Sequence, residues 1–301
     1  LTIGIPAYNE EFSISQIMNS IFSQELSEVS LKKILVIIDA STDNTLGIVK
    51  SLQSTHPEIE IIVRKKRAGK ASALNMMYLK TRTDYLLTID ADLVLGDPFC
   101  ISKLVTHMEK NKKLLLTSTR HAPLIPNTLM GKFAAYSYLI LENTTRKINN
   151  GNNFYSVMGM EMMPKKFYKS FTLPKGTLSD QCYVYATAIS KQSDGFLLVK
   201  DACTYFMPVQ TFHDWMVLSV RSTRGDKNDV VSRFGHDILS RYSIPKLMYA
   251  KSVLKFFLLS PVYTTGAILM EILIRLFPYK KNVVSKGIWE ITTSSKQLLN
   301  L

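Results

Sequence analysis

Four short hydrophobic runs near the start of the chain each end in a polar segment that is followed by a helix-like stretch. The runs cover residues 2–5, 34–38, 59–63 and 85–89. Strand, polar loop and helix in repeated succession is the pattern of a parallel sheet with crossover helices. Ligands of such sheets bind beyond the carboxyl ends of the strands. The pattern therefore predicts an α/β fold, with a mostly parallel sheet flanked by helices and four polar loops at one edge.

The composition is that of a globular protein. A chain of 301 residues that is 46% hydrophobic favours one large domain with an appendage over two equal domains. Its 37 basic and 24 acidic residues give a net charge of +13, which favours anionic partners such as a nucleotide, phospholipid head groups or nucleic acid. The basic residues are spread along the chain without a recognition motif, which argues against nucleic acid. Three cysteines without Cys-x-x-Cys spacing predict neither a disulfide framework nor a zinc site.

Two carboxylates one residue apart, Asp90 and Asp92, follow the last of these strands. Where a strand breaks into a loop, both side chains can turn toward one point, which suits a divalent cation beside phosphates. Asp-x-Asp at a strand end also serves as a turn or a helix cap. The motif therefore indicates a cation site only in combination with the other three loops.

The four loops together resemble those of the inverting family 2 glycosyltransferases of GT-A fold. The resemblance rests on Pro6-Ala7-Tyr8-Asn9-Glu10, Asp39-Ala40-Ser41-Thr42-Asp43-Asn44-Thr45, Gly69-Lys70-Ala71-Ser72-Ala73-Leu74-Asn75 and Asp90-Ala91-Asp92, in this order and spacing. It covers roughly residues 1–227 and implies a catalytic domain there, with a donor half over about 1–120 and an acceptor half over about 121–227. Residues 228–301 would form a helical appendage rich in basic and apolar side chains.

The resemblance implies a nucleoside site in the first two loops. Pro6, Tyr8 and Glu10 would hold the nucleoside, with Tyr8 offering a stacking face and Glu10 accepting hydrogen bonds from ribose hydroxyls. Asp39 resembles the residue that accepts a hydrogen bond from the ring nitrogen of uracil. A UDP-sugar is therefore the favoured donor.

The resemblance also assigns charged residues to the diphosphate. Asp92 would hold Mg²⁺ or Mn²⁺, a Lewis acid that stabilises developing negative charge, and Asp90 would face the ribose or a metal-bound water. Arg67 and Lys70 would bring positive charge toward the base and the diphosphate. Arg221 is the one residue retained from the Gln-x-x-Arg-Trp motif of processive synthases, and its planar fork suits a diphosphate. Loss of the Gln and Trp predicts non-processive transfer.

Asp180 is the candidate catalytic base. It stands at the predicted start of a helix over 178–188, in the position of the Asp of the family's Glu-Asp motif, with Ser179 in place of the usual Glu. The resemblance implies that its carboxylate deprotonates the acceptor hydroxyl, and a helix cap is the alternative role. A helix N-terminus stabilises the carboxylate form, so a base there depends on geometry more than on a raised pKa.

Beyond Pro245, lysines alternate with apolar runs. The longest uncharged stretch, 256–270, is shorter than the roughly 20 residues needed to span a bilayer. Basic residues beside apolar patches suit a helix at a membrane surface, and a helical appendage packed on the catalytic domain is the alternative. The expected location is the cytoplasm or the inner face of the cell membrane.

The first hypothesis is therefore an inverting, metal-dependent, non-processive hexosyl- or N-acetylhexosaminyltransferase that uses a UDP-sugar and a saccharide or lipid-linked acceptor. A polyprenyl-phosphate glycosyl synthase is the enzymatic alternative, kept open by the basic and apolar C-terminal region. A non-catalytic sugar-nucleotide sensor or a nucleic-acid-binding protein is the alternative of another class. The three intact carboxylates Asp39, Asp92 and Asp180 argue against the sensor.

Overall fold

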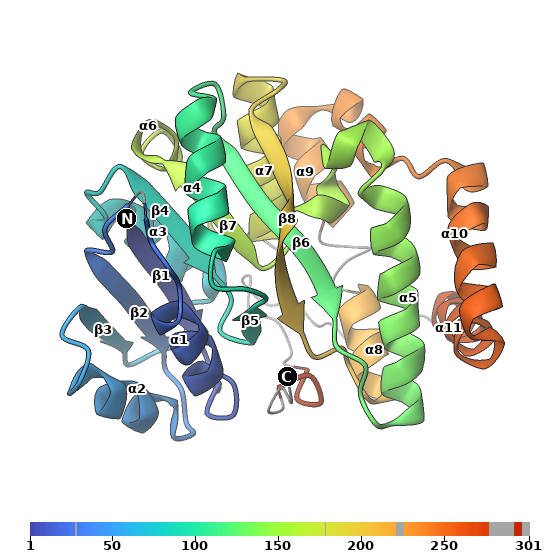
Figure 1. Ribbon diagram of the computed structural model, residues 1–301, viewed down its shortest axis with the longest axis horizontal. Helices are drawn as coiled ribbons and strands as arrows, with labels where there is room; N and C mark the ends of the chain where they lie inside the picture. Colours follow the sequence, from blue (N-terminus) through green and yellow to red (C-terminus); the bar gives the residue numbers. More distant parts are fainter. Residues whose placement is uncertain (28, 178, 221–225, 277–291, 297–301) are drawn as a thin grey trace.

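The computed structural model describes residues 1–27, 29–177, 179–220, 226–276 and 292–296. In this part of the chain, one eight-stranded sheet of order β3-β2-β1-β4-β7-β6-β8-β5 runs through the molecule (Figure 1). Strands β3, β2, β1 and β4 are mutually parallel, β7 is antiparallel to both β4 and β6, β8 is parallel to β6, and β5 is antiparallel to β8.

The strands are β1 (Thr2–Ala7), β2 (Lys33–Asp39), β3 (Ile59–Arg64), β4 (Tyr85–Ile89), β5 (Leu93–Leu95), β6 (Leu116–Pro123), β7 (Met160–Pro164) and β8 (Phe196–Phe206). The helices are α1 (Ile14–Phe22), α2 (Thr45–Gln53), α3 (Lys70–Lys80), α4 (Cys100–Lys110), α5 (Leu129–Thr145), α6 (Lys165–Tyr168), α7 (Asp180–Lys191), α8 (Phe212–Val220), α9 (Asp226–Phe234), α10 (Lys246–Leu259) and α11 (Pro261–Leu276). Short 3₁₀ turns are η1 (Ile148–Gly151), η2 (Phe154–Ser156) and η4 (His236–Tyr242).

Side chains of the central strands alternate between two cores. In β2, Ile34, Val36 and Ile38 are buried with α1, α2 and α4, whereas Leu35 and Ile37 are buried on the opposite face with α3 and α7. Successive strand side chains point to opposite faces, so a strand that is apolar at every position requires cover on both. The predicted α/β architecture is confirmed.

Close packing of α3 on β1 helps to position the candidate site. A Cβ atom at Gly4 would lie 2.6 Å from Sδ of Met77, so glycine allows the helix to approach the strand closely. Helix α3 begins at Lys70. The approach therefore helps to bring the Lys70 end of α3 to the carboxyl end of the sheet.

Strand β5 departs from the sequence pattern. Leu93–Leu95 follows Asp92 directly and pairs with β8, at the far edge of the sheet from β3. Three residues are too few to show a period, so the pattern does not predict this strand. Because β5 pairs with β8 and not with a neighbour of β4, the extended strand is interrupted between β4 and β5, where Asp90 and Asp92 lie.

The C-terminal helices pack on α5. Phe133 of α5 lies against Gly266 of α11, and Asn143 of α5 bonds Ser252 of α10 at 2.8 Å. The predicted domain boundary at residue 227 falls within α9, whose Val230 joins the core that contains α3 and α7; the division into domains stays a prediction. No helix in the described ranges has both the length and the apolar character needed to cross a membrane.

Candidate active site

The carboxyl end of the sheet and the first turns of α3 and α7 surround one small pocket. Its lining includes Pro6, Lys70, Asp90 and Asp180, four of the residues predicted from sequence, and Glu161. These residues come from β1, α3, the loop after β4, α7 and β7. The fold thus brings the predicted nucleotide side and the predicted base into one cavity.

Lys70 joins the two sides of this pocket. Its Nζ lies 2.7 Å from Oδ1 of Asp90 and 3.0 Å from Oδ2 of Asp180. Asp180 is the first residue of α7 and is 6% exposed, while Ser179 at the N-cap makes no side-chain capping bond. The Asp180 carboxylate is therefore held by an ammonium group inside the pocket.

Asp90 carries a perturbed carboxyl. Desolvation is the main cause that raises its pKa, and the charges of Asp92 and Asp180 add to it, while Lys70 lowers it. The N–H of Asp90 donates to the carbonyl oxygen of Gly159 at 2.8 Å. This bond holds the loop after β4 next to the residue that precedes β7.

Glu161 is a pocket residue that the sequence analysis did not identify. It lies in β7 opposite Thr88, is 2% exposed, and its Oε1 has no hydrogen-bond partner among the described residues. Burial, followed by the charge of Asp180, raises its pKa to about 8, and Lys70 opposes the shift. The carboxyl is therefore mainly protonated at neutral pH. The available sequence signal was a single charge in the otherwise apolar run Met160-Glu161-Met162-Met163.

Tyr8 and Arg67 lie together on the predicted nucleoside side. The guanidinium carbon of Arg67 lies 3.9 Å from the centroid of the Tyr8 ring, within the range of a cation–π contact. The structure therefore stacks the guanidinium of Arg67 over the ring of Tyr8, two predicted residues from different loops.

Asp39 organises the loop that leads into α3. It is 5% exposed and accepts hydrogen bonds from the N–H groups of Ala68 at 3.0 Å and Gly69 at 2.7 Å, and Arg64 pairs with it at 3.1 Å. These contacts position the start of α3 and hence Lys70. Its predicted contact with a nucleobase stays a prediction.

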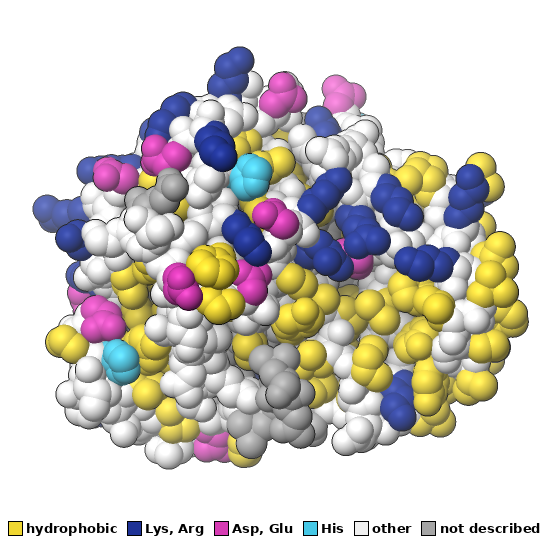
Figure 2. Space-filling model, viewed as in Figure 1, with side chains coloured by type: hydrophobic (Ala, Val, Ile, Leu, Met, Phe, Trp, Pro, Cys, Tyr) yellow, Lys and Arg dark blue, Asp and Glu magenta, His cyan; other side chains and the backbone are white. Residues whose placement is uncertain are grey.

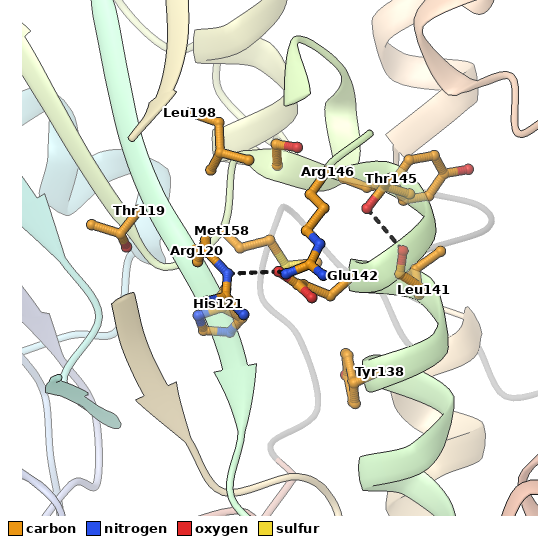
Figure 3. A pocket seen from close by; sticks show the side chains of 12 residues that line it. Thr119, Arg120, His121, Tyr138, Leu141, Glu142, Thr145, Arg146, Met158 and Leu198 are labelled. Carbon is orange, nitrogen blue, oxygen red and sulfur yellow. Dashed lines mark hydrogen bonds and ion pairs between the residues drawn. The ribbon is translucent and has the colours of Figure 1, made fainter. Parts of the chain in front are cut away.

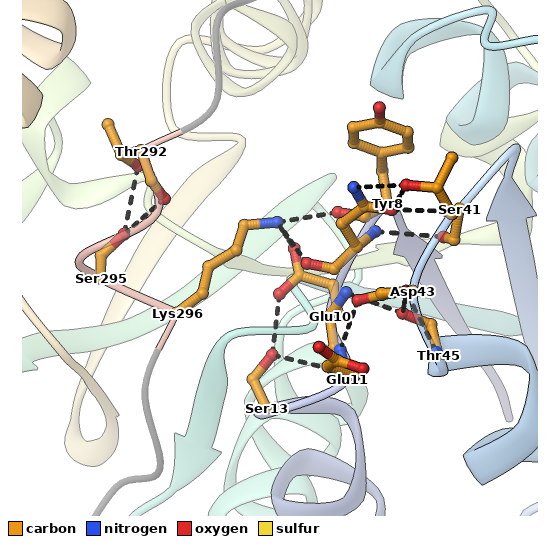
Figure 4. A network of polar contacts seen from close by, with 12 residues as sticks. Tyr8, Glu10, Glu11, Ser13, Ser41, Asp43, Thr45, Thr292, Ser295 and Lys296 are labelled. Atoms are coloured by element: carbon orange, nitrogen blue, oxygen red, sulfur yellow. Dashed lines mark hydrogen bonds and ion pairs between the residues drawn. The ribbon is translucent and has the colours of Figure 1, made fainter.

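Glu10 is engaged at both carboxylate oxygens (Figure 4). Oε2 accepts from Oγ of Ser13 at 2.7 Å, and Oε1 forms an ion pair with Lys296. Burial and, after it, the charge of Asp92 raise the pKa of Glu10 to about 7, whereas Lys296 lowers it. Asp92 thus lies close enough to Glu10 for its charge to act on that carboxyl, and the predicted ribose contact of Glu10 stays a prediction.

The carboxylate of Asp92 fits a divalent cation whose other ligands come from the substrate. Within the described ranges, no three His, Cys, Asp or Glu side chains form a ready-made metal site. Mg²⁺ in nucleotide sites is bound by one or two carboxylates together with phosphate oxygens, and Mn²⁺ also favours oxygen ligands. Asp92 supplies a carboxylate of this kind. Arg221, the predicted diphosphate clamp, lies outside the described residues.

A second pocket lies between β6 and α5 (Figure 3). Nε of Arg120 is 2.8 Å and Nη1 of Arg146 is 3.7 Å from the same Glu142 oxygen. Two guanidinium groups thus share one carboxylate. Met158 lines this pocket, and the next residue in the chain, Gly159, lines the pocket of Lys70 and Asp180.

Solved structures of glycosyltransferases share this fold. A mannosyltransferase from Pyrobaculum calidifontis, solved with GDP-Man and Mn²⁺, superposes with a TM-score of 0.58 at 16% identity over 92% of this chain and 80% of its own. The TarS protein of S. aureus, residues 1–349 with UDP-GlcNAc, gives a TM-score of 0.53 at 14% identity over 95% and 94%. The fold, with its acidic pocket at the carboxyl ends of the strands, is that of a GT-A glycosyltransferase.

The chain belongs to glycosyl transferase family 2, whose model matches residues 2–171, more than half of its length. The poly-β-1,6-N-acetyl-D-glucosamine synthase of Staphylococcus epidermidis is 28% identical over 136 residues, 44% of this chain and 31% of that enzyme. A dolichyl-phosphate β-glucosyltransferase of Trichomonas vaginalis is 31% identical over 96 residues, 30% of this chain and 28% of that enzyme. The chain thus spans about a third of the length of these curated relatives.

Proposed function

We propose that this glycosyltransferase moves a hexose or N-acetylhexosamine, with inversion and one sugar per encounter, from a nucleoside diphosphate sugar to a saccharide or lipid-linked acceptor. A UDP-sugar is the favoured donor and Mg²⁺ or Mn²⁺ the favoured cation. The contact of Lys70 with both Asp90 and Asp180 carries this proposal, because it joins a residue of the predicted nucleotide loop to the predicted base.

In the proposed reaction, Asp180 takes the proton from an acceptor hydroxyl as that oxygen attacks the anomeric carbon. The bond from the anomeric carbon to the diphosphate breaks, and its electron pair leaves with the diphosphate. Attack opposite the leaving group inverts the configuration. Lys70 supplies positive charge near the departing group, and a cation at Asp92 would neutralise the remaining phosphate charge. The neutral acid at Glu161 adds no further negative charge.

Two features support the narrower parts of this proposal. The stacked Tyr8–Arg67 pair consists of two planar groups of the kind that stack on a nucleobase. Leu218 in α8 occupies the position of the Gln in the processive motif, so that part of the platform for a polymer end is missing. A uridine donor and single-sugar transfer remain parts of the proposal.

A panel of nucleotide sugars tests the proposal. Purified protein is incubated with UDP- and GDP-sugars, with Mn²⁺ or with chelator, and both nucleotide release and thermal stability are measured. A ligand that binds only the folded state raises the unfolding midpoint. Stabilisation by one nucleotide together with release of the same nucleotide supports the proposal. No stabilisation and no release with any donor contradict it.

A lipid-phosphate acceptor is the second candidate function, and the pocket of Arg120 and Arg146 favours it. Two guanidinium groups around one carboxylate leave a net positive charge, and Arg is well suited to phosphate. One of its lining residues, Met158, is followed in the chain by Gly159, which lines the pocket of Lys70 and Asp180.

The outer faces of α10 and α11 support the same candidate. Apolar side chains gather over these two helices, and Lys and Arg side chains gather next to them (Figure 2). The most exposed include Leu247 at 69%, Leu258 at 75% and Val262 at 67%. Exposed Lys251 and Lys255 lie in the same helix α10. Apolar side chains beside lysines suit contact with an anionic membrane, from which a lipid-linked acceptor would reach the arginine pocket.

A further inference from the structure

A five-residue segment near the end of the chain, Thr292–Lys296, contacts the loop that follows β1 (Figure 4). Nζ of Lys296 donates to the carbonyl oxygens of Tyr8 at 2.8 Å and Asn9 at 3.0 Å, and it forms an ion pair with Glu10. An ammonium group has three donors and no acceptor. The contacts with this one loop are therefore enough to use all three hydrogens.

The backbone of this loop adopts an uncommon conformation at Asn9. Asn9 has a φ of 53°, in the left-handed region that few residues other than glycine and asparagine adopt. On one side, its N–H donates to Oγ of Ser41 at 3.1 Å and its side-chain oxygen accepts from the N–H of Thr42 at 2.8 Å. Lys296 supports its carbonyl oxygen. The loop is thus held by two segments that are distant in sequence.

The segment that carries Lys296 is itself anchored. The N–H and Oγ of Ser294 donate to Oδ2 of Asp214 at 2.8 and 2.6 Å, and the N–H of Gln210 donates to Oγ of Ser294 at 3.0 Å. Asp214 is 5% exposed and lies in the first turn of α8. Hydrogen bonds to a buried carboxylate are strong, so the backbone segment that carries Lys296 is held in place.

We infer that Lys296 is a positioning residue of the donor site, which holds the nucleoside loop Tyr8–Glu10 in the conformation that receives the donor. The inference rests on the proposed function, because it treats this loop as the nucleoside site. The side chains of Lys296 and Glu10 are 15% and 11% exposed, so solvent and salt screen their attraction little. A loop fixed before binding lowers the ordering cost that the donor would otherwise meet.

Kinetics of Lys296→Ala and Lys296→Arg test this role. We expect Lys296→Ala to raise the KM for the donor and the Kd for its nucleotide about tenfold, the scale of losing a hydrogen bond to a charged group. The kcat should change little, since the residue acts through loop position and not on the reacting atoms. Lys296→Arg should restore part of the affinity.

Lys103→Ala is the matched control. Nζ of Lys103 contacts the Asp97 carboxylate at 3.1 Å and the carbonyl oxygen of Asp201 at 2.7 Å, so the variant loses the same kinds of bond away from the donor loop. Asp214→Asn, which weakens the anchor of Ser294, is the second test variant. It should shift donor KM in the same direction as Lys296→Ala.

Hydrogen–deuterium exchange of residues 7–11 without nucleotide completes the test. Faster exchange in Lys296→Ala than in Lys103→Ala, together with weaker donor binding, supports the inference. Unchanged exchange, or donor KM equal to that of the unmodified protein, overturns it. If the unmodified protein bound no nucleotide, the proposed function would fail, whereas the exchange comparison would still decide whether Lys296 holds the loop.

Discussion

Nζ of Lys70 lies 3.0 Å from Oδ2 of Asp180, although the two residues begin different helices and are more than a hundred positions apart. Both belong to motifs that the sequence analysis places in separate halves of the predicted catalytic domain. In the proposed reaction, the candidate base is therefore contacted by the group that would also face the donor diphosphate. Under this proposal, one ammonium group lies next to both the departing diphosphate and the carboxylate that takes the acceptor proton.

We predict that Asp180→Asn lowers sugar transfer by about 10²-fold or more, the usual scale for losing a general base, while donor affinity stays within a few-fold. Initial rates and nucleotide calorimetry measure the two effects. Asp194→Asn, an exposed aspartate beyond the other end of α7, is the control. Transfer that survives while the melting temperature falls would show that Asp180 is a structural residue.

We predict that Asp92→Asn removes the effect of Mn²⁺ on nucleotide diphosphate binding, because an amide does not balance the charge of a cation. Titration of nucleotide with Mn²⁺ and with chelator, in both proteins, measures the difference. The unmodified protein should bind more tightly with the metal. Equal affinity with and without metal in the unmodified protein would count against a metal at this site.

We predict that Glu161→Gln flattens the loss of stability at alkaline pH. The pKa of Glu161 in the folded protein is about 8, above the ordinary value of 4.5, so the folded state keeps a proton that the unfolded state releases. The free energy of unfolding therefore falls as pH rises from about 4.5 through about 8. Glutamine mimics the neutral acid and lacks this dependence.

Denaturant unfolding of both proteins between pH 5 and 9 measures the effect of Glu161. The unmodified protein should lose stability relative to Glu161→Gln across this range. Taking the difference cancels the contribution of Glu10, whose pKa is raised in the same direction. Parallel curves would show that Glu161 titrates normally.

We predict that Arg146→Gln weakens use of a polyprenyl phosphate acceptor about tenfold or more, since it removes a charge-assisted hydrogen bond to phosphate. Hydrolysis of the donor without acceptor should be unchanged, which separates acceptor binding from donor chemistry. Exposed Arg82→Gln is the control. Equal rates with the lipid phosphate in all three proteins, or transfer to saccharides alone, would reject the lipid-phosphate candidate.

We predict that Leu258→Ser/Leu259→Ser reduces binding to vesicles that contain phosphatidylglycerol without lowering the melting temperature, because these side chains are 75% and 67% exposed. Binding of the unmodified protein should fall steeply with salt, as each nearby lysine contributes about 1 kcal/mol that ions screen. Co-sedimentation at low and high salt measures both effects. Leu79→Ser, at 78% exposure in α3, is the control. Absence of binding at low salt would leave α10 and α11 as a packed appendage.

The local sequence determined the sheet of β1–β4, its crossover helices and the edge at which the site opens. This succeeded because apolar runs, polar loops and helix starts depend on residues close together in the chain. The resemblance to the family 2 motifs predicted four of the pocket residues, Pro6, Lys70, Asp90 and Asp180, and each of them stands at the end of a strand or the start of a helix.

Only the tertiary structure decided how these residues meet the rest of the chain. Glu161 became a pocket residue because β7 enters the sheet antiparallel to β4 and brings it opposite Thr88, a register that no local pattern encodes. Lys296 contacts Glu10, which is 286 residues away in the sequence, and no periodicity or spacing in the sequence predicts this contact. Strand and helix signals are local, whereas burial of a lone carboxyl and pairing of distant charges depend on long-range packing, which a single sequence does not display.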